Sequence, residues 1–196
     1  MPPAPTIRSV AVFCGSRHGH DPAMGRAAQA LGTGLAERSL RLVYGGGRIG
    51  LMGVIANAVL AGGGDVSGVI PEFLTRSEAA HEHVHDLTVT DSMHTRKQRM
   101  FSLADAFVTM PGGLGTLDET VEIVTWRQLR LHDKPVLICN VGNWADGLLA
   151  AFAASVRDGF ADEPRGTLFE VLPDVASVLR RLETIPTPAP GHVDHM

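Results

Sequence analysis

The chain has 196 residues, of which 44% are hydrophobic and 19% are charged, and its formal net charge is −4. This balance is ordinary for a globular protein with a sizeable core, and it argues against a nucleic-acid-binding surface. No run approaches the ~18 apolar residues of a membrane span, and the first residues lack the pattern of a signal peptide. The two cysteines, Cys14 and Cys139, fit packing positions in a reduced compartment. We therefore expect a cytoplasmic protein that binds neither nucleic acid nor membrane.

Strand and helix patterns alternate along the chain. Short apolar runs predict strands at 10–14, 40–44, 66–70, 84–89, 106–110, 136–140 and 168–172. Helices are predicted at 22–38, 51–61, 92–104, 116–131, 144–158 and 173–182. Residues 72–83 are ambiguous, and we expect a loop with one helical turn there.

This alternation predicts an α/β, Rossmann-like, doubly wound parallel sheet of about six or seven strands with helices on both faces. We expect a single nucleotide-binding domain over residues 1–183. Proline and polar residues predict a disordered tail over 184–196.

The glycine-rich segment from Met110 to Glu119 gives the strongest functional signal. It joins a predicted strand to a predicted helix, where backbone N–H groups and the helix dipole can hold a phosphate. Gly15 and the run Gly45–Gly47 follow two other predicted strands. Because ligands bind beyond the carboxyl ends of parallel strands, these glycines are expected to meet in one crevice. The carboxylate of Glu119 beside a phosphate cradle indicates chemistry on a phosphorylated substrate.

Thr116 and Glu119 also match a local structural pattern. Their spacing fits a capping box, in which Thr116 would cap the helix and Glu119 would bond back to its N–H group. The capping box and a catalytic carboxylate are therefore both open interpretations. The glycine run before Thr116 favours the catalytic one, because a cap needs no close approach of bare backbone.

The segment Gly45–Gly50 literally satisfies G-x-G-x-x-G, the fingerprint of dinucleotide-binding folds. It lies on the second predicted strand, not the first, and Asp65 comes too early for the expected acidic residue. A nucleotide phosphate site is favoured over an NAD site, and glycines that merely turn the chain are the structural alternative.

Two further polar segments have functional and structural interpretations. Arg96 shares a helical face with Met93 and Met100, so we expect it near the core, where a guanidinium needs an anionic partner. His81, His83 and His85 would face one side of a strand, but no fourth ligand follows by spacing and no metal site is expected. The only lysines, Lys97 and Lys134, make a Schiff-base enzyme an unattractive hypothesis.

Together, these motifs resemble the LOG (Lonely guy) family over residues ~8 to 172. The matching segments are Phe13–Ser16, Tyr44–Gly53, Gly68–Pro71, Met93–Lys97, Pro111–Glu119, Thr125–Leu129 and His132–Pro135. The resemblance implies a Rossmann-like homodimer without a cofactor. It implies a phosphoribohydrolase that cleaves the N-glycosidic bond of cytokinin riboside 5′-monophosphates, and also AMP, to free base and ribose 5-phosphate. Members are often labelled "possible lysine decarboxylase", a label that the motifs do not support mechanistically.

The resemblance also implies particular site residues. Its catalytic pair falls on Arg96 and Glu119. Substrate-binding positions are expected at Gly15, Ser16, Gly46, Gly47, Glu78, Lys97, Gly112, Gly113, Leu114, Gly115, Thr116 and Thr125. Arg48 stands where the family pattern has a small residue.

In the implied mechanism, the glycine loop holds the 5′-phosphate and Glu119 stabilises the oxocarbenium ion or activates water. Arg96 orients Glu119 and the substrate, or stabilises charge on the leaving purine. The alternatives are a nucleotide-binding carrier or sensor without hydrolysis, and an NAD-linked oxidoreductase.

Overall fold

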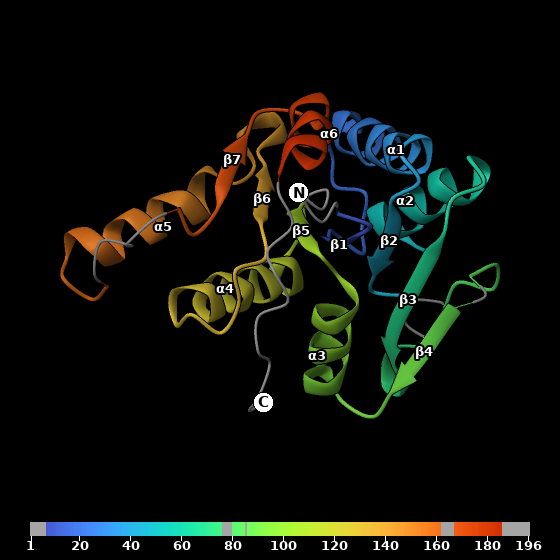
Figure 1. Ribbon diagram of the computed structural model, residues 1–196, viewed down its shortest axis with the longest axis horizontal. Coiled ribbons are helices and arrows are strands. Elements are labelled where there is room, and N and C mark those ends of the chain that lie inside the picture. Colours follow the sequence, from blue (N-terminus) through green and yellow to red (C-terminus); the bar gives the residue numbers. More distant parts are fainter. Residues whose placement is uncertain (1–6, 76–79, 85, 162–166, 186–196) are drawn as a thin grey trace, which may run out of the picture.

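The computed structural model describes residues 7–75, 80–84, 86–161 and 167–185. Strands in this part of the chain form one seven-stranded sheet in the order β4-β3-β2-β1-β5-β6-β7, and all neighbouring pairs run parallel (Figure 1). The strands are β1 (Ser9–Phe13), β2 (Arg41–Tyr44), β3 (Val66–Pro71), β4 (Asp86–Thr90), β5 (Ala106–Thr109), β6 (Val136–Cys139) and β7 (Glu170–Leu172). The predicted α/β fold with a parallel sheet is confirmed.

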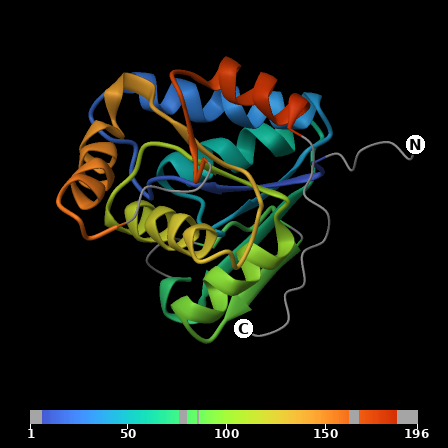
Figure 2. The same cartoon turned by 60° about the vertical axis from the view of Figure 1, so that its left-hand side comes forward.

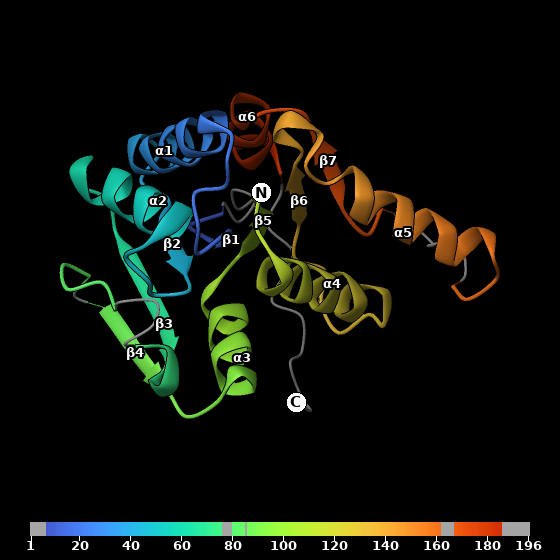
Figure 3. The same cartoon turned by 180° about the vertical axis from the view of Figure 1, so that it is seen from behind.

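Helices cover both faces of this sheet, so that the molecule has three layers (Figure 2). One face carries α1 (Pro22–Glu37), α2 (Gly50–Ala61) and α6 (Val175–Thr184), and the other carries α3 (Met93–Leu103) and α4 (Leu114–Gln128). A further helix, α5 (Asp146–Arg157), extends outward at the β7 end (Figures 1 and 3). Among the described helices, none is long and apolar enough to cross a bilayer.

Three helix starts follow from side-chain caps in the sequence. The Asp21 carboxylate accepts a hydrogen bond from the Ala23 N–H at 2.8 Å, and Pro22 occupies the first turn, as the Asp-Pro pair predicts. Ser92 caps α3 and Asp174 caps α6 in the same way, each accepting from a backbone N–H three residues later. The predicted last helix therefore starts at Val175 instead of 173.

The strand order places a crevice at the centre of the sheet. From β1 the chain moves outward through β2 and β3 to β4, and it then returns to the other side of β1 as β5. The connections after β1 and β5 therefore leave in opposite directions from neighbouring strands. This reversal is the topological switch point at which open α/β sheets bind ligands.

Several element boundaries differ from the predicted ones. Strand β4 begins at Asp86, so His81 and His83 lie in a turn before it and not on a strand; His85 is outside the described residues. A 3-10 helix, η2 (Val141–Asn143), precedes α5, and a second one, η1 (Glu72–Leu74), is the helical turn expected within 72–83. The predicted tail falls mostly on residues 186–196, which are also outside the described part of the chain.

Candidate active site

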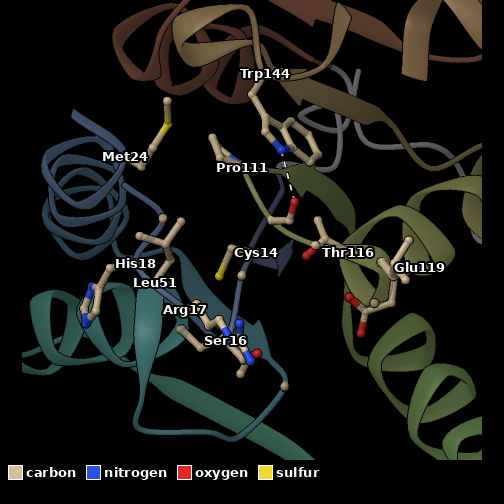
Figure 4. Close-up of a pocket in the computed structure, with 18 of the residues that line it drawn as sticks. Cys14, Ser16, Arg17, His18, Met24, Leu51, Pro111, Thr116, Glu119 and Trp144 are labelled. Carbon is tan, nitrogen blue, oxygen red and sulfur yellow. Dashed lines mark hydrogen bonds between the residues drawn. The ribbon is translucent and has the colours of Figure 1, made fainter. Parts of the chain in front are cut away.

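A cavity of about 760 Å³ opens at the carboxyl ends of β1 and β5 (Figure 4). The loop after β1 lines one side from Cys14 to Asp21, and the loop after β5 with the start of α4 lines the other from Pro111 to Gly115. The cavity thus coincides with the topological switch point. Its size is within the usual range for small-molecule sites.

The glycine loop is held against the β1 loop by backbone contacts. The Gly15 N–H donates to the Pro111 carbonyl at 3.0 Å. A Cβ atom on Gly112 would lie 2.1 Å from Thr116 Oγ1 and 2.9 Å from the Gly15 nitrogen, so a side chain cannot fit there. Gly112 is therefore required by close packing between the two loops.

Helix α4 starts directly at the cavity. Its N-cap is Gly113, and Leu114 and Gly115 in its first turn line the cavity and are exposed. The N-cap glycine has no side chain with which to cap the helix. The first N–H groups of α4 have no intrahelical carbonyl, and they carry the positive end of the helix dipole. This helix start can bind an anion such as a phosphate.

The capping-box interpretation of Thr116 and Glu119 is wrong. Because α4 begins at Leu114 instead of Thr116, Thr116 lies inside the first turn and Glu119 lies in the second. Both side chains are buried and line the cavity. Glu119 is thus too far along the helix for a capping role, and Figure 4 shows its carboxylate on the α4 side of the cavity.

Arg96 on α3 is buried, as the helical pattern predicted, and it meets Glu119, the partner that the LOG resemblance implied. An Arg96 terminal nitrogen lies 3.8 Å from Glu119 Oε1, and only 5% of Arg96 and 7% of Glu119 are exposed. The Arg96 guanidinium also donates to the Gly45 carbonyl at 3.4 Å. A Cβ atom on Gly45 would come within 2.1 Å of this guanidinium, so the first glycine after β2 makes room for Arg96.

Arg96 retains one unused donor. Its Nε is buried and has no hydrogen-bond partner within the described residues. A buried donor without a partner is costly, and such a group is more often found at functional sites than elsewhere in a fold.

Cys14 lies in the same cavity at the end of β1. Burial, with a smaller contribution from the negative charge of Glu119, raises the pKa of the Cys14 thiol far above its ordinary value. The side chain therefore stays a neutral thiol and is not a nucleophile at neutral pH. Cys139 is also buried and unpaired, so both cysteines are packing residues as expected.

Comparisons with known proteins identify the family of this chain. The family model described as "Possible lysine decarboxylase" matches residues 52–182. A probable cytokinin riboside 5′-monophosphate phosphoribohydrolase of Oryza sativa subsp. japonica is 47% identical over 177 residues, covering 90% of this chain and 78% of the relative. A cytokinin riboside 5′-monophosphate phosphoribohydrolase of Rhodococcoides fascians is 46% identical over 157 residues, covering 80% and 79%. The chain belongs to the LOG family.

Solved structures support the fold of this LOG-family chain. A molybdenum cofactor binding protein from Rippkaea orientalis superposes with a TM-score of 0.68 at 19% identity, covering 90% of this chain and 95% of that one. At this identity the likeness shows the fold alone.

Not all residues that the LOG resemblance implied lie in this cavity. Gly46 and Gly47 do not line it; the Gly46 carbonyl accepts from the His81 N–H at 3.0 Å, and Gly47 pairs with Ala80. Of the three glycines of the G-x-G-x-x-G fingerprint, only Gly45 therefore lines the cavity, which weakens the argument for a dinucleotide.

Three other implied residues lie elsewhere or are not described. Lys97 forms ion pairs with Asp118 at 3.2 Å and Glu122 at 3.1 Å on α4. Thr125 is exposed, and it does not line the cavity. Glu78 is outside the described residues. The structure therefore assembles the glycine loop, Ser16, Arg96 and Glu119, but not Lys97 or Thr125.

The sequence interpretation missed several residues that complete the cavity wall. Met24 on α1, Leu51 and Met52 on α2, and Trp144 after η2 all line it. Leu51 and Met52 lie in the matching segment Tyr44–Gly53 but were not assigned to the site, while Met24 and Trp144 carry no local motif. These residues come together only through packing of α1, α2 and the β6 loop around the switch point. Among the described residues, no group of three or more His, Cys, Asp or Glu side chains could hold a metal ion.

Proposed function

We propose that this LOG-family chain hydrolyses the N-glycosidic bond of cytokinin riboside 5′-monophosphates and of AMP. The products are the free base and ribose 5-phosphate. The observation that carries this proposal is the placement of one buried carboxylate–guanidinium pair and one open helix N-terminus in the same cavity. The names of the relatives support the same substrate class.

The 5′-phosphate is proposed to bind at the start of α4. Gly113, Leu114 and Gly115 offer backbone N–H groups there, and the Thr116 hydroxyl lies in the same turn. Between Gly113 and Glu119 the helix rises about 9 Å. This span leaves room for a ribose between the bound phosphate and the carboxylate. Phosphate binding would thus orient the glycosidic carbon at Glu119.

Glu119 is proposed to stabilise the oxocarbenium ion that develops at the ribose and to activate the attacking water. A carboxylate in a largely water-excluded site is effective in this role, because its interaction with a developing cation is only weakly screened. Arg96 is proposed to hold Glu119 in place through the ion pair between them.

Direct product analysis tests this function. The purified protein is incubated with isopentenyladenosine 5′-monophosphate, with AMP, and with the corresponding nucleosides, and free base and ribose 5-phosphate are quantified. We expect base release from the monophosphates and much less from the nucleosides. Absence of base release from both monophosphates, although they bind, would replace the hydrolase with a nucleotide carrier.

We also propose that the protein is a cytoplasmic homodimer. Large apolar side chains are exposed on and near α4 and after α5, namely those of Val121, Leu129, Leu131 and Phe160. Burying them against a second copy would remove apolar surface from water. Sedimentation velocity tests this: we expect a dimer, and dissociation in Leu129→Glu. A monomer at all accessible concentrations would contradict the proposal.

A further inference from the structure

Trp144 contacts the glycine loop from a distant part of the chain. It follows η2 in the connection after β6, it is half-buried, and its ring lines the cavity. Its indole Nε1 donates to the Gly112 carbonyl at 3.1 Å, as the dashed line in Figure 4 shows. Trp144 has no part in the roles proposed above for the glycine loop, Arg96 and Glu119.

The hydrogen bond fixes the orientation of one peptide group. In a trans peptide, the carbonyl of one residue and the N–H of the next point in opposite directions, and the described chain has no cis peptide bond. With its carbonyl bonded to Trp144, the Gly112–Gly113 peptide holds the Gly113 N–H on the side away from the indole. The bond between the Gly15 N–H and the Pro111 carbonyl orients the Gly112 N–H in the same manner.

This restraint matters because both residues of the peptide are glycines. Glycine populates positive and negative φ about equally, so the Gly112–Gly113 peptide can flip at little steric cost. A flip would direct a carbonyl oxygen to the place where the N–H had pointed, and a carbonyl repels an anion. The hydrogen bond from Trp144 disfavours the flipped state.

The segment that carries Trp144 is itself fixed at both ends. The Asn140 side chain accepts from the Ala145 N–H at 2.7 Å and donates to the Asp146 carboxylate at 2.8 Å. Gly142 adopts a left-handed φ of 60°, and a Cβ atom there would lie 2.9 Å from the Met24 terminal methyl group. Trp144 thus stands on a short connection that is closed by Asn140 and packed on α1.

We propose that Trp144 is a positioning residue for binding of the substrate's 5′-phosphate. Its indole N–H holds the Gly112–Gly113 peptide in the orientation that presents the Gly113 N–H to the phosphate. This inference rests on the proposed phosphate cradle, and it adds a residue from the β6 loop to the loops after β1 and β5.

The test measures ligand affinity separately from turnover. Ribose 5-phosphate and AMP are titrated by calorimetry into the protein with Trp144, with Trp144→Phe, and with β-(3-benzothienyl)alanine at position 144, each in a Glu119→Gln background so that AMP is not consumed. The benzothienyl ring keeps the shape of indole and replaces its N–H with sulfur. The matched control is Trp126→Phe, because Trp126 packs on Phe101 and does not line the cavity.

We expect both substitutions at Trp144 to weaken ribose 5-phosphate and AMP binding by roughly 3- to 10-fold, the worth of one hydrogen bond. Trp126→Phe is expected to bind both ligands as wild type does. If the benzothienyl variant binds ribose 5-phosphate as tightly as wild type, the hydrogen bond does not position the cradle and the inference is wrong.

The same experiment separates this inference from the proposed reaction. Binding of ribose 5-phosphate that weakens on loss of the indole N–H supports the role of Trp144, even if no base is released from any monophosphate. Failure of wild type to bind either phosphorylated ligand would refute the cradle and the role of Trp144 together.

Discussion

Arg96 and Glu119 come from different helices and meet across 3.8 Å in a cavity where each side chain is more than nine-tenths buried. Arg96 lies on α3 and Glu119 on α4, on the same face of the sheet. Burial of a charged pair is expensive unless its groups are well compensated. An arrangement of this kind is typical of functional sites, which hold a charged group away from water although its burial lowers the stability of the fold.

Glu119→Gln is expected to slow hydrolysis strongly while the protein stays folded. Gln has nearly the same shape, but it cannot supply negative charge to an oxocarbenium ion or accept a proton from water. We expect kcat to fall by about 10²- to 10⁴-fold. Base release measured by chromatography checks this, with circular dichroism to confirm folding.

The matched control for this substitution is Asp118→Asn on the same helix. Asp118 is more than half exposed, and it pairs with Lys97 outside the cavity. Asp118→Asn therefore also replaces a carboxylate with an amide, but outside the proposed site. We expect its kcat to stay near the wild-type value. If the kcat of Glu119→Gln equals that of Asp118→Asn, Glu119 is not a catalytic residue.

The buried pair should also show strong energetic coupling. Arg96→Met and Glu119→Leu each leave a buried charge without its partner, which costs about 3–5 kcal/mol of unfolding free energy. The double variant removes both charges, so we expect it to be more stable than the sum of the single losses predicts. Urea unfolding of the four proteins measures this coupling.

An exposed pair provides the comparison for that cycle. Arg38 and Glu183 approach to 2.6 Å, but half of the Glu183 side chain is exposed to solvent. Glu183→Gln should cost less than about 1 kcal/mol. If the losses of unfolding free energy from Arg96→Met and Glu119→Leu simply add in the double variant, the two side chains do not act as a unit.

The sequence predicted those features that depend on short stretches of chain. The alternation of apolar runs was sufficient for the parallel sheet, and Asp21-Pro22 was sufficient for the start of α1. The spacing from Met93 to Arg96 correctly placed the guanidinium on the buried side of α3. Glycine runs at strand ends also indicated the crevice, because the edge where parallel strands end is fixed by topology.

Features that depend on contacts between distant segments were not predictable in this way. A four-residue pattern could not show that α4 already begins at Leu114, ahead of Thr116, so the capping box was a false signal. Gly46 and Gly47 were expected in the site, but their backbone instead pairs with residues 80–81, a contact that no local pattern indicates. Trp144 gave no signal, because its partner Gly112 is 32 positions away.

Gly112→Ala is expected to disrupt the cradle more than any loop glycine with free space around it. The added methyl group would collide with Thr116 Oγ1 and the Gly15 nitrogen, at 2.1 and 2.9 Å. The β1 and β5 loops would have to separate, which breaks the bond between the Gly15 N–H and the Pro111 carbonyl. We expect affinity for AMP to fall at least about tenfold, with a loss of roughly 1–3 kcal/mol in stability.

Gly147→Ala on α5 is the control for a methyl group added to glycine. A Cβ atom at this position would have no described atom within 4 Å beyond its own helix and chain neighbours, and alanine favours helix. Unfolding free energy should be unchanged or higher, and AMP affinity should match wild type. Calorimetry in a Glu119→Gln background, which does not consume AMP, measures these affinities. AMP binding by Gly112→Ala that equals that of Gly147→Ala would contradict the close-packing argument.

His132 should make the protein less stable as the pH falls below about 6.5. Burial is the main cause that lowers the pKa of His132, and the nearby positive charges of Arg127 and Lys134 lower it further. The hydrogen bond to Ile123 and the negative charge of Asp133 act in the opposite direction. The ring packs on Phe101 and Phe107. Its Nδ1 accepts the Lys134 N–H at 3.1 Å, while Nε2 lies 3.0 Å from the Ile123 carbonyl. Both contacts are satisfied only by a neutral ring with the proton on Nε2.

The direction of the pH effect follows from proton binding. Above about pH 6.5 the histidine is neutral in the folded and unfolded states alike, and it adds no pH dependence. Below that pH the unfolded chain binds a proton that the folded protein resists, so the free energy of unfolding decreases as the pH falls.

Urea unfolding from about pH 7.5 to about pH 5.5 should show a steeper decline in the free energy of unfolding for wild type than for His132→Gln. His81 is also buried with a lowered pKa, and it contributes equally to both proteins, so their difference isolates His132. Parallel curves for the two proteins would mean that His132 is protonated as easily in the folded state as in the unfolded one.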